Sequence, residues 1–176
     1  MVIVLENDLM QLVEFQHVKP GKGGAFVRTK LKNVLTGRVL EKTYRSGEKF
    51  EEARLDAQVW QYLYNDGDLY HFMHKETFEQ LAVGRDTVGD KDQWLKENND
   101  ATLMFYKDKP ISIDIPFFVE LKITQCDPGV QGDRATSGNK PATLETGAVV
   151  QVPLFIEEGT VIRVDTRTRA YIERVS

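Results

Sequence analysis

Cysteine and histidine are scarce in this sequence, and long apolar runs are missing. The chain has 1 Cys and 3 His among 176 residues. The single thiol, Cys126, excludes an internal disulfide framework and fits the reducing conditions of the cytoplasm. Three histidines without a partner cysteine do not make a metal-binding set. No apolar run approaches the ~20 residues needed to cross a bilayer, and the apolar start at residues 1–5 is too short for a signal peptide. We therefore expect a cytoplasmic protein with no metal, disulfide framework or membrane segment.

A net positive charge is also missing. The chain has 23 Lys and Arg against 27 Asp and Glu, a net charge of −4, which argues against general coating of nucleic acid. The charge is unevenly distributed, however, because residues 17–45 hold eight basic residues and one acid, a net +7. A basic segment on an acidic chain favours a polyanionic partner at one end. Lysines that protect a sheet edge from pairing explain only part of this charge.

The basic segment contains a Gly-rich stretch, VKPGKGGAF at 18–26, between strand-like runs at 9–15 and 25–31. Pro20-Gly21 suit the centre of a type II turn, because proline fixes φ and glycine accepts a positive φ. The pattern predicts a hairpin tip that presents the amine of Lys22. From spacing alone, an ordinary Gly-rich loop with solvated lysines explains the stretch equally well.

Short alternating runs separated by Gly, Asn and Asp predict an all-β chain. The net charge is +3 over residues 1–54, −6 over 55–117 and −1 over 118–176. Each block has about 55–65 residues, which is enough to fold alone. Strands are expected near residues 2–5, 9–17, 25–33, 37–44, 56–64, 69–74, 102–106, 111–115, 117–126, 148–152, 160–164 and 170–175, with short helical turns near 75–81 and 90–96. We therefore predict three consecutive small β-barrel domains with these block boundaries.

Several motifs together resemble bacterial translation elongation factor P. In chain order they are HVKPGKGGAFVR at 17–28, NVLTG at 33–37, EKTYRSGE at 41–48, YLYNDGD at 62–68 and KPATLETGAVVQVP at 140–153. The match covers nearly the whole chain, and the ordered set is far more specific than any single motif. The resemblance implies an SH3-like or KOW-like first barrel followed by two OB-fold barrels, in an elongated, L-shaped monomer. It also implies a short lead before the first strand, so a truncated or alternative start is expected.

The resemblance further implies a translation factor that is not an enzyme. Such proteins bind the 70S ribosome between the peptidyl (P) and exit (E) sites, contact the peptidyl-tRNA and relieve stalling at consecutive prolines. Lys22 would be the modification site, commonly β-lysylated by a lysine-modifying enzyme, and would reach the acceptor end of the tRNA. An arm that steadies the tRNA end favours productive alignment, which is an orientation effect. No cofactor is implied apart from this covalent modification.

Two sets of residues are expected to contact RNA. The tRNA and rRNA set surrounds the tip and consists of Lys19, Gly21, Gly23, Gly24, Arg28, Lys30 and Lys32. Cationic side chains there would fix register through phosphates without reading sequence. The second set resembles a family loop that approaches mRNA on the small subunit, and it consists of Gly132, Asp133, Arg134, Gly138 and Lys140. Solvated strand lysines and a flexible surface loop are the alternatives that need no partner.

Two positions depart from the family pattern. His74 lies where Asp is common, and we interpret it as a tolerated surface change. Residues 167–170, Arg-Thr-Arg-Ala, replace a common Thr-Gly-Glu turn. The missing glycine puts the turn geometry in doubt, and the change adds positive charge where the third block could face RNA.

Two other function classes remain as alternatives. A standalone single-stranded nucleic-acid-binding protein could use the same OB barrels, but the net charge of −4 counts against it. An enzyme could use Lys22 as a Schiff-base nucleophile, but that role needs a desolvated lysine and not one on an open tip. The aromatic residues over 60–72 could form a base-stacking platform, but their alternation favours a packed hairpin.

Overall fold

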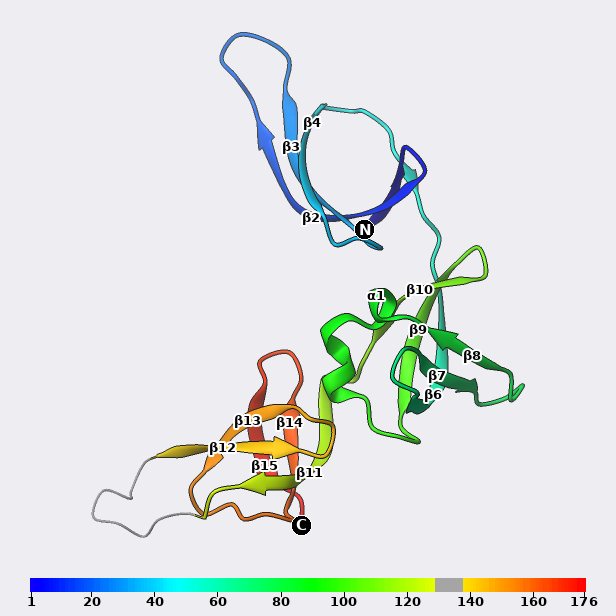
Figure 1. Cartoon of the computed structure of the whole chain (residues 1–176). Helices are drawn as coiled ribbons and strands as arrows, with labels where there is room; N and C mark the ends of the chain where they lie inside the picture. Colours follow the sequence, from blue (N-terminus) through cyan, green and yellow to red (C-terminus); the bar gives the residue numbers. More distant parts are fainter. Residues whose placement is uncertain (129–137) are drawn as a thin grey trace. The chain divides into compact units, whose positions relative to one another are not determined.

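The computed structural model describes residues 1–128 and 138–176, and nearly all of its regular structure is β-strand. Three antiparallel five-stranded sheets follow one another along the chain, with strand orders β4-β3-β2-β1-β5, β10-β9-β6-β7-β8 and β13-β12-β11-β14-β15 (Figure 1). The predicted all-β chain with three consecutive β units is confirmed. Two compact units are also distinguished by their internal contacts, residues 1–58 with 103–112 and residues 59–102 with 113–176.

The first sheet curls back on itself (Figure 1). Its strands are β1 (Val2–Leu5), β2 (Asp8–Val18), β3 (Phe26–Asn33), β4 (Val39–Arg45) and β5 (Glu51–Glu52). Alternation along the strands sends every second side chain inward, and the buried residues Ile3, Met10, Leu31 and Tyr44 form the core of the curl. The hairpin formed by β2 and β3 projects beyond this curl (Figure 1).

The second sheet is built around an aromatic hairpin. Its strands are β6 (Asp56–Asn65), β7 (Tyr70–His74), β8 (Gln80–Val83), β9 (Asp100–Tyr106) and β10 (Lys109–Asp114). Tyr62 lies opposite Phe72 in the β6–β7 register, and the Trp60 and Phe72 side chains are both buried. The prediction of a packed hairpin in place of a base-stacking platform is confirmed for these rings. Tyr64 differs, since it is exposed and stacks on His71 with ring centroids 4.5 Å apart.

The third sheet encloses an apolar cluster of its own. Its strands are β11 (Phe118–Cys126), β12 (Asn139–Leu144), β13 (Val149–Pro153), β14 (Val161–Asp165) and β15 (Ala170–Arg174). Inward-facing Leu121, Leu144 and Ile162 are among the fully buried side chains of this cluster, and Trp94 packs into it from outside the sheet. Trp94 ends the 3-10 helix η1 (Gly89–Trp94), which follows the single α-helical turn α1 (Arg85–Val88).

The structure corrects three local expectations. The helical turn predicted over 75–81 is wrong, because Gln80–Val83 instead pairs with β7 as β8. The strand Asn139–Leu144 was not predicted, since it begins with a polar Asn-Lys-Pro run. His74 is not a free surface residue: its Nδ1 accepts the backbone N–H groups of Glu76 and Thr77 at 3.2 Å each. The helical turn predicted near 90–96 is confirmed by η1.

The described helices are too short and too polar to cross a membrane. The longest of them, η1, has six residues.

Candidate nucleic-acid interface

The predicted functional hairpin is formed by β2 and β3. Their register runs from Met10 opposite Asn33 to Val18 opposite Phe26, which leaves residues 19–25 as an unpaired loop at the end (Figure 1). A bulge between Leu12 and Glu14 interrupts the ladder, and such a bulge increases the local twist of the strands. Residues 19–24 are all exposed, so the loop presents Lys22 to solvent.

The backbone of this loop differs from the predicted type II turn. That turn needs a positive φ at its second central residue, Gly21. The positive φ of 121° instead belongs to Gly23, directly after Lys22. A side chain is strained at such a φ, whereas a Cβ added at Gly21 or Gly24 would meet nothing within 4 Å. Gly23 is therefore the position of this loop at which the backbone requires glycine.

The predicted cations of β3 share one face of the strand. Arg28, Lys30 and Lys32 alternate with Thr29 and Leu31, which are buried on the other face. The row is consequently aimed away from the core, as a phosphate-binding face requires.

These cations differ in their availability to a partner. The ammonium of Lys30 lies 3.0 Å from the Glu14 carboxylate, and the hydrogen bond and charge of Glu14 raise the pKa of Lys30. Arg28 lies over the Phe26 ring, with its guanidinium carbon 5.8 Å from the ring centroid. Lys19 and Lys32 are exposed. Lys30 must therefore exchange Glu14 for phosphate, whereas Arg28 needs no such exchange.

Sequence reasoning missed an exposed aromatic residue on the same hairpin. The Phe15 side chain is 63% exposed and Val13 beside it is 52% exposed. A shallow depression of about 520 Å³ lies here, and Phe15, Arg28, Lys30 and Lys42 are among its lining residues. The missed signal was an aromatic residue alternating with polar ones in a basic hairpin. Exposed aromatic rings beside cations provide stacking surfaces for unpaired bases.

The second predicted set lies only partly within the described chain. Gly132, Asp133 and Arg134 fall outside the described residues. Gly138 is exposed just before β12, but Lys140 is only 5% exposed. The Lys140 ammonium donates a hydrogen bond to the carbonyl of Asp127. We therefore leave Lys140 out of the proposed RNA contacts.

The hairpin presents amines, a guanidinium group and backbone amides, which suit binding to phosphate groups. Within residues 1–128 and 138–176, no group of three or more His, Cys, Asp or Glu residues is arranged to hold a metal ion.

Comparison with known families assigns the chain along its length. The model described as "Elongation factor P (EF-P) KOW-like domain" matches residues 1–50, "Elongation factor P (EF-P) OB domain" matches 55–113, and "Elongation factor P, C-terminal" matches 119–174. The elongation factor P of Thermoanaerobacter sp. (strain X514) is 56% identical over 173 residues, covering 98% of this chain and 94% of that protein. This chain belongs to the elongation factor P family.

Other comparisons agree with this assignment. The elongation factor P of Natranaerobius thermophilus is 54% identical over 175 residues, covering 99% of this chain and 93% of the relative. The solved structure of eukaryotic translation initiation factor 5A from Methanococcus jannaschii is 19% identical, with a TM-score of 0.50, and the match covers 64% of this chain and 86% of that one. That structural likeness concerns the fold alone. The elongation factor P assignment and the predicted fold class are confirmed, and family membership makes this protein a translation elongation factor.

Proposed function

We propose that this protein acts in the cytoplasm on the 70S ribosome, between the P and E sites. There it contacts the peptidyl-tRNA, stimulates peptide-bond formation and relieves stalling at consecutive prolines. The observation that carries this proposal is the exposed Lys22 at the end of the β2–β3 hairpin, in a chain of the elongation factor P family.

Lys22 acts as a positioning arm in this proposal. Its flexible four-carbon stem ends in a compact cation, and β-lysylation by a lysine-modifying enzyme would lengthen the arm further. Such an arm steadies the tRNA acceptor end and lowers the entropic part of the barrier. The ribosome supplies the bond chemistry, so this protein is not an enzyme.

The remaining RNA contacts divide by their role. Lys19, Arg28, Lys30 and Lys32 bind tRNA or rRNA phosphates, with Lys30 leaving Glu14 to do so. Gly21, Gly23 and Gly24 let RNA approach the loop backbone closely. We keep Gly132, Asp133, Arg134 and Gly138 as the proposed mRNA contacts, on the family resemblance.

The test is synthesis in vitro of a reporter with consecutive prolines. Lys22→Ala should abolish most rescue while shifting the free energy of unfolding by no more than ~0.5 kcal/mol, because the side chain is exposed. Lys22→Arg should also fail wherever the modification needs a primary amine, although the charge is kept.

Lys49→Ala is the matched control, since it removes an exposed lysine of the same block outside the hairpin. It should rescue like the modified wild type. Full rescue by a Lys22→Ala protein that melts like the wild type would show that the hairpin tip does not take part in the mechanism.

A further inference from the structure

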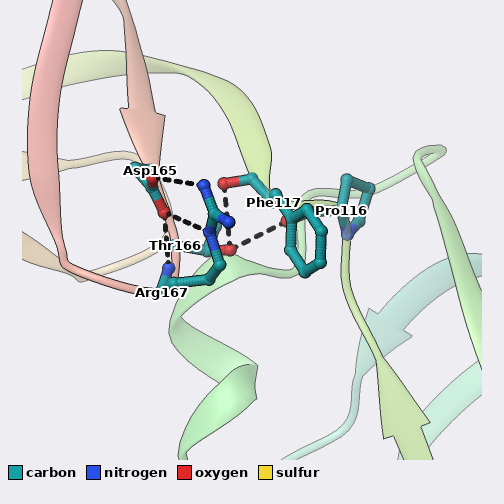
Figure 2. Close-up of polar contacts among 5 residues, drawn as sticks. All are labelled: Pro116, Phe117, Asp165, Thr166 and Arg167. Atoms are coloured by element: carbon teal, nitrogen blue, oxygen red, sulfur yellow. Dashed lines mark hydrogen bonds and ion pairs between the residues drawn. The ribbon is translucent and has the colours of Figure 1, made fainter.

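The turn between β14 and β15 is tied to the segment that precedes β11. The Arg167 guanidinium donates to both carboxylate oxygens of Asp165, with Nε–Oδ1 and Nη2–Oδ2 distances of 3.1 and 2.8 Å (Figure 2). The Thr166 hydroxyl donates to the Pro116 carbonyl at 2.8 Å, and the Thr166 N–H donates to the Phe117 carbonyl at 2.8 Å. The turn and the 116–117 segment are thus held in one arrangement.

This arrangement places a flat cation beside an exposed ring. The guanidinium carbon of Arg167 lies 4.4 Å from the Phe117 ring centroid. The Phe117 residue is nevertheless 60% exposed. The two-point contact with Asp165 fixes the plane of the guanidinium group. The pair is therefore preorganised as a stacking surface.

Arg169 adds a more available cation to the same place. Its backbone has a φ of 61°, a conformation that is unfavourable for most side chains and concentrates at functional sites. Its guanidinium carbon lies 5.7 Å from the Trp94 ring centroid, and the hydrogen bond that its Nη2 donates to the Val149 carbonyl is long at 3.5 Å. Among the described residues it makes no ion pair.

A cavity of about 330 Å³ opens between these groups, lined among others by Trp94, Phe117, Arg167 and Arg169. That volume lies in the range of small-ligand sites. Lys91 also lines it, but its ammonium donates to the Ile113 carbonyl.

Two carboxylates on the rim decide how an anionic ligand would lie. Asp90 and Asp114 both line the cavity near Lys91, and Lys91 lies 3.5 Å from the Asp114 carboxylate. The two carboxylates outnumber the Lys91 ammonium on this side of the cavity, so a negative group is favoured on the Arg169 side.

We propose that this cavity binds one unpaired nucleotide of an RNA strand. The base stacks on the Phe117–Arg167 pair, and the phosphate binds Arg169. Unpaired bases are recognised by stacking on aromatic rings and guanidinium planes, and arginine is the residue best suited to phosphate. RNA is chosen over a free nucleotide because the site is open and because the proposed function brings this protein to RNA. The proposal rests on the proposed function only for this choice of RNA over a free nucleotide.

The test uses the full-length, ¹⁵N-labelled protein with two probes, a single-stranded RNA tetranucleotide and adenosine monophosphate. The chain has 2 Trp, so the Trp94 indole N–H signal is one of two and is assigned with Trp60→Phe. The tetranucleotide should shift the Trp94 signal at concentrations about tenfold below those needed for the monophosphate, since added phosphates strengthen binding. Equal or tighter binding of the monophosphate would overturn the choice of RNA.

Two variants test the site while keeping the Asp165–Arg167 pair. Phe117→Ala removes the stacking ring, and Arg169→Asn removes the cation with a residue that tolerates a positive φ. Each should weaken the Trp94-detected binding by about fivefold or more. Phe155→Ala, which removes a ring that is 70% exposed and does not line the cavity, should stay within about twofold.

Thermal melts confirm that each variant is folded. Wild-type affinity in both site variants would overturn the proposal. A Trp94 signal that the tetranucleotide does not shift would also overturn it. If that protein still rescues the proline reporter through Lys22, the proposed function would nevertheless stand.

Discussion

Asp66 shows how a single carboxylate organises the β6–β7 turn. It accepts the backbone N–H groups of Asp68 and Leu69 at 2.9 and 2.8 Å, and its other oxygen lies 2.8 Å from His71 Nε2. The hydrogen bond from His71 and the two backbone hydrogen bonds lower the pKa of Asp66 to about 2. Because the pKa is depressed in the folded state, this carboxylate stabilises the fold above its ordinary pKa, and that contribution is lost as the pH falls toward about 2.

We predict that His71→Ala raises the pKa of Asp66. The value should remain below the ordinary 3.8, because the two backbone donors are retained. A ¹³C NMR titration of the Asp66 carboxyl group measures this directly. His17→Ala, on the other hairpin, should leave the titration unchanged, and an unchanged curve in His71→Ala would show that His71 does not set this pKa.

Lys140 and His74 mark the limit of prediction at single residues. A lysine next to a Gly-rich polar stretch is normally solvated, yet Lys140 is buried on β12, where it pairs with Val152 of β13 and its ammonium donates to the Asp127 carbonyl. His74 lies edge-on to Trp60, with ring centroids 5.1 Å apart. The burial of Lys140 and the Trp60 contact of His74 depend on other strands, so no local pattern could reveal them, whereas the hydrogen bonds of His74 to Glu76 and Thr77 are local. Exposure of Lys22 was predictable, because turn residues on both sides determine it.

At the scale of elements, the stability of the hairpin loop depends on which of its glycines has the positive φ. We predict that Gly23→Ala destabilises the protein by about 1–2 kcal/mol, the usual cost of a side chain in a left-handed conformation. Gly21→Ala should be neutral or stabilising by up to about 1 kcal/mol, because its conformation accepts a side chain and the unfolded chain loses freedom. Thermal and urea unfolding of the two variants measures the difference.

The two glycine variants control for each other, since both lie in the exposed loop beside Lys22. Equal stability of both proteins would mean that the loop relaxes without cost. A larger loss of stability in Gly21→Ala than in Gly23→Ala would instead support the type II turn that the sequence predicted.

Strand patterns predicted most elements but missed three. Alternation identified β6, β9 and β11, where one face is buried and the other is solvated. It missed β5, β8 and β12, since β5 has only two residues, β8 has only four and β12 contains Pro141. These strands form because neighbouring strands supply their backbone hydrogen-bond partners, and the local sequence does not reveal those partners.

At the scale of the whole molecule, positive and negative charge are separated along the chain. The +7 segment at 17–45 precedes residues 55–176, which carry a net charge of −7. The sequence alone predicted this polarity and the family. For the Phe117–Arg167–Arg169 site, the sequence offered only the departure from the family pattern at 167–170. The ring and the cations of this site come from segments about 50 residues apart, which are joined by the hydrogen bond from Thr166 to Pro116.

The separation of charge predicts strongly salt-dependent binding to ribosomes. Each phosphate contact releases counterions, so the logarithm of the binding constant should fall linearly with the logarithm of salt concentration. Arg28→Ala should weaken binding and reduce the slope by about one. Lys30→Ala should have a smaller effect, because Lys30 already has Glu14 as a partner at 3.0 Å.

Glu14→Ala tests this reasoning in the opposite direction, since it frees Lys30 and removes a negative charge from the same face. It should tighten binding and steepen the slope, as measured by co-sedimentation with 70S ribosomes between about 50 and 200 mM salt. A Glu14→Ala protein that binds more weakly than wild type, while melting normally, would mean that the Glu14–Lys30 pair itself contacts the ribosome. Salt-independent binding of the wild type would mean that the basic hairpin does not contact phosphates, and the cations of β3 would then have to be explained by protection of the sheet.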